Sequence, residues 1–429
     1  MLRPLSRTVL ALPLGAALLA VGTPVAAEGV TIRHWTLKNP NLPEFIAEAK
    51  ASFEEQNPGV TIVHEDFPNE AYKTAIQVAL KGSEPPDSFF NWVGEDSARF
   101  VREGLVADIS DYGKGEDGFQ SVLSEGWLSA LTYDGRLYGV PMEAVSKFFY
   151  YSVPFFEEHG LEVPTSFEGL LETCGKIRGI DEDIVPLPLG NSERWKVNHY
   201  ITMLNERVLG ADATAADYAL EAPEEELFTD PGYVEAWEKL LAMQEAGCFQ
   251  DAPNATSPEI SRAMFSSGAA PMIYCGSWCA GIFDSDGFTD YAMFRMPGVE
   301  GGRGASDTNF VLVQGYQVSA KSEHPEETVA WLSHLVSAEV ARAFAEQVQR
   351  IPSNPELLAE SDALTEQFKW IAEDVSAVSR PINVLDVLLE NSVSEAYLDA
   401  GVEVLNGTLT PEQAMSKIRD VALEAKSRG

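Results

Sequence analysis

Four tryptophans stand beside polar or charged side chains at places where the chain is predicted to leave a strand or run through a loop. They are Trp35, Trp92, Trp195 and Trp278. Indole faces can stack on the C–H faces of a pyranose ring, while neighbours such as Asn39 and Glu95 can exchange hydrogen bonds with its hydroxyl groups. Core packing explains most single tryptophans, so only the four together indicate a carbohydrate-binding site.

Signals of catalysis are missing from the sequence. It contains no GxSxG or HExxH motif, and the loop 298–304 lacks the GxGxxG spacing of a phosphate-binding turn. The six histidines occur singly, and the 66 acidic residues are too abundant for any pair of carboxylates to be diagnostic. We therefore predict a binding protein rather than an enzyme, with no metal and no cofactor.

Short apolar strands alternate with amphipathic helices, which is the pattern of an α/β protein. Predicted strands cover residues 30–37, 60–65, 88–92, 270–274, 291–295 and 310–319. Predicted helices cover residues 42–56, 72–81, 98–103, 166–178, 195–209, 233–245 and 258–265, and the chain is mostly helical from residue 325. Successive strand–helix units imply a mainly parallel sheet, and ligands of such sheets bind beyond the carboxyl ends of the strands.

The segment 139–156, GVPMEAVSKFFYYSVPFF, reads as a buried strand that nevertheless carries two charges, Glu143 and Lys147. Burying a charge is costly unless it is paired or serves a site. We expect the glutamate to reach a ligand cleft. For the lysine, a place beside the cleft and a place facing solvent are equally compatible with the sequence.

Residues 1–27 have the features of a secretory signal peptide: Arg3 and Arg7, an apolar core, and a small-residue cleavage site at residues 25–27. The mature chain is expected to be soluble in the periplasm. It would retain 28 basic and 66 acidic residues, a net charge of −38. Such a field repels phosphate backbones and anionic lipids, so nucleic acids and membrane surfaces are not expected partners.

The four cysteines, Cys174, Cys248, Cys275 and Cys279, would follow the chain into an oxidising compartment. Three pairings are possible, and buried free thiols are an alternative. A bridge between Cys174 and Cys248 is one candidate. Cys275 and Cys279 have no nearby histidine, which argues against zinc.

Several short stretches together resemble extracellular solute-binding protein family 1, the periplasmic sugar-binding proteins of ABC importers, the group that includes maltose-binding protein. These stretches are FEEQNPGV at 53–60, ALKG at 79–82, GLV at 104–106, DGRLYGVP at 134–141, MFSSGAAPM at 264–272, GSW at 276–278, RIP at 350–352 and TPEQA at 410–414. Their order and spacing make the resemblance specific.

The resemblance implies an α/β, two-lobed periplasmic binding protein fold with a ligand cleft between the lobes. Residues 28–140 with about 292–338 would form the first lobe, and residues 141–291 with about 339–429 the second. Sugar would bridge the lobes, and the closed form would be recognised by the membrane permease subunits of the ABC transporter. The protein is expected to be a monomer.

The resemblance also implies the residues that bind ligand. Glu143 would stand hydrated in the cleft, at a position where the family's glutamate bonds sugar hydroxyls. Trp92, Glu95, Trp195 and Trp278 match ligand contacts of the two lobes, and Trp35, Asn39, Asn309 and Arg350 complete the predicted set. Maltose itself is not implied, because the stretch 191–200 and Asp386 depart from the maltose-binding pattern.

Two alternatives stay open. The same fold could bind a polyamine or a polyol, for which the aromatic rings and the carboxylates of Glu95 and Glu143 are also suited. An exported carbohydrate-active enzyme would instead need two carboxyl groups at a fixed separation across a cleft, and the sequence singles out no such pair.

Overall fold

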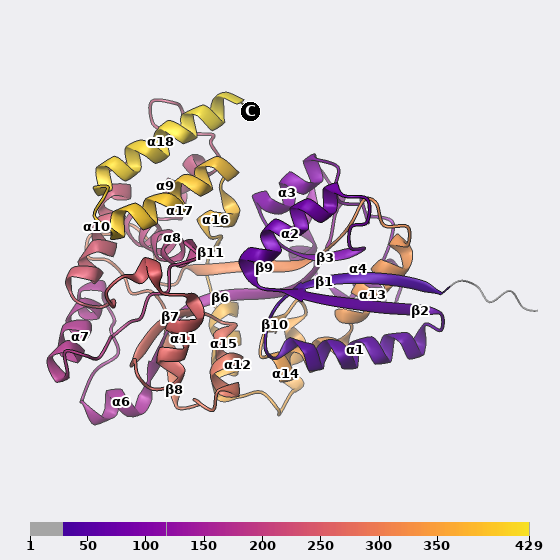
Figure 1. The fold of residues 1–429 in the computed structure, drawn as a ribbon, viewed down its shortest axis with the longest axis horizontal. Coiled ribbons are helices and arrows are strands. Elements are labelled where there is room, and N and C mark those ends of the chain that lie inside the picture. Colours follow the sequence, from indigo (N-terminus) through magenta and orange to yellow (C-terminus); the bar gives the residue numbers. More distant parts are fainter. Residues whose placement is uncertain (1–28, 117, 429) are drawn as a thin grey trace, which may run out of the picture.

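The protein has two lobes joined by long strands, as a computed structural model shows for residues 29–116 and 118–428 (Figure 1). The predicted signal peptide lies outside these described residues. The first lobe contains β1 (Val30–Leu37), α1 (Leu42–Gln56), β2 (Val60–Phe67), α2 (Asn69–Lys81), β3 (Ser88–Trp92), α3 (Glu95–Arg102), α4 (Phe119–Val122), α5 (Glu125–Ser129), β4 (Thr132–Tyr133), β5 (Arg136–Leu137), α13 (Pro325–Leu335) and α14 (Ala338–Val348).

The second lobe is mostly helical and follows in the chain. It contains α6 (Val153–Glu158), α7 (Phe167–Ile180), α8 (Trp195–Leu209), α9 (Ala211–Tyr218), α10 (Gly232–Glu245), η1 (Pro253–Ala255), α11 (Pro258–Ser266), β7 (Met272–Gly276), α12 (Cys279–Ser285), β8 (Tyr291–Phe294), η2 (Pro355–Glu360), α15 (Glu366–Ser376), β11 (Pro381–Ile382), α16 (Leu385–Leu388), α17 (Asn391–Leu405) and α18 (Pro411–Arg428). The strands β6 (Val140–Ser152), β9 (Asn309–Val318) and β10 (Ile351–Pro352) lie between the lobes (Figure 1).

One sheet runs through both lobes, in the order β10-β6-β9-β3-β1-β2, with β7 and β8 paired to β6 and β11 paired to β9. The β1–β2 and β1–β3 pairs are parallel, whereas β9 is antiparallel to β3 and β6. Residues 140–146 of β6 pair with β9, and residues 147–152 pair with β7 and β8. The strand β6, which carries Glu143 and Lys147, is therefore part of the sheet in both lobes.

Local sequence signals set many of the element boundaries. On α1, Phe45, Ile46, Ala49 and Phe53 are buried along one face, and the turn after the helix uses Gly59 at φ 99°. Ser152, Ser166, Ser257 and Thr365 accept backbone hydrogen bonds at the N-termini of α6, α7, α11 and α15.

The apolar cores depart in two places from the lobe boundaries predicted from the sequence. Tyr291–Phe294 (β8) pairs with the second half of β6, and Phe310 and Leu312 belong to the larger core of the second lobe. Ala338–Val348 (α14) instead packs on α1 and contributes Phe344 to the core of the first lobe. We therefore propose that the chain crosses between the lobes within β6, within β9 and after α14.

Two disulfides occur in the second lobe. Cys174 on α7 pairs with Cys248, which follows α10, and Cys275 at the end of β7 pairs with Cys279 at the start of α12. The second bridge spans the loop that carries Trp278. Among the described residues, no helix is long and apolar enough to cross a membrane.

Candidate ligand-binding site

A cavity of about 540 Å³ lies between the two lobes. Its first-lobe wall comes from the loop after β1, the start of α2, the end of β3 and α3. Its second-lobe wall comes from α8, α11, α12, α16 and the first half of β9. Volumes of this size are typical of small-molecule sites. The cavity lies beyond the carboxyl ends of β1 and β3, which is where a parallel sheet is expected to bind ligands.

Five of the predicted residues line this cavity. They are Asn39, Trp92, Trp195, Trp278 and Arg350. They come from positions 39 to 350 of the chain and from both lobes, so only the tertiary fold brings them together. Their contact with a ligand remains a prediction.

Four predicted residues do not line the cavity: Glu143, which lies beside it, and three others that lie elsewhere. Trp35 is buried in the first-lobe core, where its Nε1 donates to Glu65 Oε1 at 3.1 Å. Glu95 pairs on α3 with Arg102, which is an exposed residue. Asn309 is fully buried, and its Nδ2 donates to the backbone oxygen of Lys147 at 3.2 Å.

Glu143 lies beside the cavity, but it is not hydrated there. Its side chain is 4% exposed, and its Oε1 accepts from Arg350 Nη1 at 2.6 Å. The expectation of a carboxylate standing in open water is therefore wrong, because an arginine 207 positions away occupies that space. Burial raises the pKa of Glu143, although the charge and the hydrogen bond of Arg350 act in the opposite direction. Arg350 itself lines the cavity.

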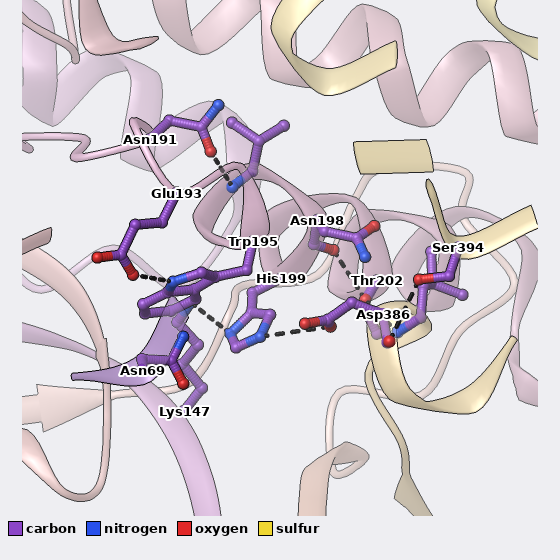
Figure 2. Close-up of polar contacts among 12 residues, drawn as sticks. Asn69, Lys147, Asn191, Glu193, Trp195, Asn198, His199, Thr202, Asp386 and Ser394 are labelled. Atoms are coloured by element: carbon purple, nitrogen blue, oxygen red, sulfur yellow. Dashed lines mark hydrogen bonds and ion pairs between the residues drawn. The ribbon is translucent and has the colours of Figure 1, made fainter. Parts of the chain in front are cut away.

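Two indole rings belong to the second-lobe wall. The centroids of Trp195 and Trp278 are 6.4 Å apart, and the ring planes are inclined at 56°. The Trp278 ring lies against the backbone of Gly276, where an added Cβ would be 2.0 Å from the ring. The Trp195 Nε1 donates to Glu193 Oε2 at 2.8 Å (Figure 2). Both rings are thus held by their surroundings before any ligand arrives.

The first-lobe wall offers a single indole. Trp92, at the end of β3, packs edge-to-face on Phe90 with 5.1 Å between centroids. The Lys73 ammonium lies 5.7 Å from the centroid of the Trp92 ring. Gly94 follows at φ 131°, and a Cβ there would come within 2.3 Å of the backbone oxygen of Val387 on α16. A glycine at this place permits the two lobes to approach closely beside the cavity.

A chain of polar contacts runs behind the second-lobe wall and ends at the cavity (Figure 2). The completely buried Lys147 places its Nζ 2.9 Å from Nδ1 of His199, and Nε2 of His199 lies 3.6 Å from Oδ1 of Asp386. The Lys147 ammonium also lies 4.5 Å from the centroid of the Tyr274 ring. The solvent-facing alternative for Lys147 is therefore wrong.

The protonation states of this chain follow from burial. Burial and the neighbouring Lys147 lower the pKa of His199 to about 4, so the imidazole is neutral at pH 7. Burial, with a contribution from Lys196, also holds the pKa of Lys147 well below its usual range. Nε2 of His199 faces the Asp386 carboxylate, which can only accept, so the tautomer with the proton on Nε2 fits the contacts of the ring. Burial alone would raise the pKa of Asp386, but the hydrogen bond from His199 holds it below the usual value.

Sequence reasoning missed most of the polar residues of the cavity wall. These include Lys38, Asn69, Lys73, Asp96, Glu193, His199, Glu259, Arg262 and Asp386. His199 lies one helical turn after the predicted Trp195 on α8, so the periodicity of that helix could have pointed to it, whereas Glu193 precedes the helix. No local pattern distinguishes Asp386, because α16 is only four residues long.

A sequence profile of bacterial extracellular solute-binding proteins matches residues 48–370, about three quarters of the chain. This chain belongs to that family. An uncharacterized ABC transporter extracellular-binding protein of Pyrococcus horikoshii is 27% identical over 319 residues, covering 72% of this chain and 67% of the relative.

Solved structures of the same two-lobed fold match almost the whole chain. One comes from work on xylan utilization by Caldanaerobius polysaccharolyticus, with a TM-score of 0.85 at 24% identity over 91% of this chain and 99% of that one. Another is a maltose/maltodextrin-binding domain from Bdellovibrio bacteriovorus bound to maltotriose, with a TM-score of 0.75 at 23% identity over 93% of this chain and 100% of that one. These likenesses establish the type of fold, a two-lobed α/β binding protein.

Proposed function

We propose that this solute-binding protein captures a mono- or oligosaccharide in the cavity between its lobes and delivers it to the permease of an ABC importer. The observation that carries the proposal is the meeting of Trp92 from one lobe with Trp195 and Trp278 from the other around a single cavity. Ring faces on both sides, with polar groups between them, suit a pyranose. The xylan and maltotriose associated with its structural neighbours are consistent with this ligand class.

The charges of the cavity wall favour a neutral ligand over a polyamine. Four cations line it, Lys38, Lys73, Arg262 and Arg350, and four carboxylates, Asp96, Glu193, Glu259 and Asp386. Arg262 pairs with Glu259 at 2.8 Å, and Arg350 is paired with Glu143. The chain as a whole is strongly acidic, so a balanced wall is a local property and not a consequence of composition. A polycation would find no net attraction there.

The protein acts in this proposal as a soluble periplasmic monomer without catalytic activity. Closure of the lobes on the sugar creates the form that the permease recognises, because ligand contacts on both walls stabilise the closed state relative to the open one. Incubation with oligosaccharides should leave them intact by chromatography. Release of shorter products would instead favour an exported carbohydrate-active enzyme.

A thermal-shift screen tests the ligand class directly. The panel contains xylotriose, maltotriose, chitotriose, galactose and spermidine. A ligand present at a hundredfold excess over its Kd should stabilise the protein by about 2.7 kcal/mol, so a binding sugar raises the Tm clearly. A rise in Tm with spermidine alone would contradict the proposal of a sugar ligand, but not the membership of the solute-binding protein family.

Variants of the aromatic walls then test the place of binding. Trp92→Ala and Trp278→Ala should each weaken binding of the active sugar by roughly tenfold to a hundredfold, as expected for central aromatic contacts. Trp127→Ala is the matched control, since Trp127 lies on α5, away from the cavity. Equal affinity of the two cavity variants and wild type would contradict the proposed site.

A further inference from the structure

Asp386 differs from the other three carboxylates of the cavity wall. Glu259 is paired with Arg262, Asp96 lies 3.4 Å from Arg99 Nη2, and Glu193 accepts the indole proton of Trp195. The Asp386 side chain lines the cavity, is 12% exposed, and has no lysine or arginine within 4 Å among the described residues; its buried Oδ1 faces the His199 ring nitrogen at 3.6 Å. Asp386 is therefore left without a cationic or indole partner in the described part of the chain, so its exposed part can accept from a ligand.

The position of this carboxylate is set by the backbone of α16. The backbone nitrogen of Leu385 donates to Thr202 Oγ1 of α8 at 3.2 Å, and Ser394 Oγ of α17 donates to the backbone oxygen of Asp386 at 3.2 Å (Figure 2). The next residue, Val387, lies against Gly94 of the first lobe. A helix of four residues is thus fixed from three directions, so that its acidic side chain has little freedom to leave the cavity wall.

The groups behind Asp386 keep it an acceptor. Nζ of Lys147 lies 2.9 Å from Nδ1 of His199 on one side of the ring, and Nε2 faces the Asp386 carboxylate on the other. A carboxylate can only accept, so the tautomer with the proton on Nε2 fits this arrangement. Burial acts to raise the pKa of Asp386, but the nearby His199 ring favours the charged form, and the pKa lies below its usual value. A buried carboxylate that stays charged and incompletely bonded is a strong acceptor for a donor supplied by a ligand.

The same stretch of wall also presents an aromatic surface. The rings of Trp195 and His199 are 5.0 Å apart by centroids, and Trp278 is the next ring along the wall. A pyranose ring lying on this surface would direct the hydroxyl groups at its edge toward the carboxylate.

We propose that Asp386 selects the ligand by accepting a hydrogen bond from one ring hydroxyl of a sugar that stacks on the second-lobe indoles. This inference rests on the proposed function. It specifies that the ligand is a neutral sugar with a free hydroxyl at one particular position, whose removal or replacement by fluorine abolishes the contact. His199 and Lys147 act as positioning residues, since they contact the carboxylate or its partner and not the cavity centre.

The test measures affinity of wild type, Asp386→Asn and the control Asp111→Asn by calorimetry, using the panel sugar that raises the Tm most and its monodeoxy analogues. Wild type should bind one deoxy analogue roughly tenfold to a hundredfold more weakly than the parent sugar, the range for a hydrogen bond to a charged group. In Asp386→Asn the parent should lose a similar factor, and the penalty for that one analogue should shrink to a fewfold. Asp111→Asn should keep the wild-type pattern, because the Asp111 side chain is 95% exposed and does not line the cavity.

The outcomes separate the inference from the function on which it rests. If Asp386→Asn binds as wild type does, or weakens the parent and every analogue by one common factor, the role of Asp386 is overturned while the sugar-binding function stands. If wild type binds no sugar of the panel, both are overturned together. Asp386→Glu, which keeps the charge and shifts its position, should be folded by circular dichroism and should lose the discrimination between analogues; discrimination equal to that of wild type would count against the proposal.

Discussion

Glu143 and Lys147 lie four positions apart on β6, and both are buried, but the protein accommodates their charges in different ways. The glutamate has an opposite charge in direct contact, Arg350 at 2.6 Å. The lysine has no carboxylate within 4 Å among the described residues; its contacts are a neutral imidazole and the faces of aromatic rings. One site is an ion pair at the edge of the cavity, and the other is an amine enclosed behind the cavity wall with no carboxylate of the described residues in contact.

Burial alone does not decide the free energy cost of a buried charged group, because the groups around it also contribute. Burial shifts both groups toward their neutral forms, raising the pKa of Glu143 and lowering that of Lys147. Arg350 opposes the shift at Glu143, whereas the nearby Lys196 reinforces it at Lys147. We therefore expect opposite responses when each charge is removed or its partner is taken away.

The largest change in unfolding free energy is expected when one partner of the ion pair between Glu143 and Arg350 is removed. Arg350→Met leaves a buried carboxylate without its counterion, which typically costs about 3–5 kcal/mol of unfolding free energy. Urea unfolding at pH 7 measures the loss. The double variant with Glu143→Gln, which removes the orphaned charge, should recover most of it. A loss below about 1 kcal/mol in the single variant would show that the pair contributes no more than an exposed one.

The same variant should have a defined pH dependence. A carboxyl group whose folded pKa is raised holds its proton more tightly in the folded than in the unfolded state. Its contribution to stability is therefore present at low pH and is lost as the pH rises above the ordinary value of about 4.3. Arg350→Met should be closer to wild type in unfolding free energy at pH 5 than at pH 7. The reverse order would show that Glu143 ionises freely in the variant.

A smaller effect of opposite sign is expected from Lys147→Met. Methionine has a similar length and no charge, so near pH 6 the variant should be more stable than wild type by roughly 1–3 kcal/mol. A base with a lowered folded pKa costs stability below its unfolded pKa, and the cost fades as the pH rises toward about 10.4. The difference between the two proteins should therefore shrink between pH 6 and pH 10 in parallel denaturation series. A destabilised variant would mean that the contact with His199 outweighs the cost of burying the amine.

The smallest change in unfolding free energy is expected for an exposed ion pair, which serves as a reference for the two buried groups. Arg194 lies 3.0 Å from Glu395 and 2.9 Å from Asp399, with its side chain 37% exposed. Glu395→Gln should change the unfolding free energy by less than about 0.5 kcal/mol, because solvent screens both charges and Asp399 remains. Added salt should reduce even this difference. A change as large as that of Arg350→Met would remove the distinction between buried and exposed pairs.

Elements with strong local signals could be predicted from the sequence with the same bounds as in the structure. The strand Val30–Leu37, the helix Leu42–Gln56 and the strand Ser88–Trp92 are examples, because hydrophobic periodicity and the following turn residues define them. The helix α3 begins at Glu95, three residues earlier than predicted. Gly94 starts it from a backbone conformation that the hydrophobic pattern does not encode.

The candidate site was predictable only where a residue carries its own signal. Trp92 and Trp35 have a similar sequence signature, an indole in the last residues of a strand with polar residues after it, yet Trp92 lines the cavity and Trp35 packs beside Phe67 in the core. The pairing of Glu143 with Arg350 and the place of Asp386 depend on contacts between segments that are about 200 residues apart. Such contacts are fixed by the tertiary fold and leave no trace in local periodicity.

The shared strands have a consequence for how the molecule comes apart. Residues 140–146 of β6 are part of the first lobe's ladder and residues 147–152 part of the second's, and β9 likewise serves both. If either lobe unfolds, the strands of the other lobe lose backbone hydrogen-bond partners. Both lobes should therefore unfold together. Calorimetry should then record one cooperative transition and not one for each lobe, and amides of β6 should exchange with deuterium at a rate set by global opening.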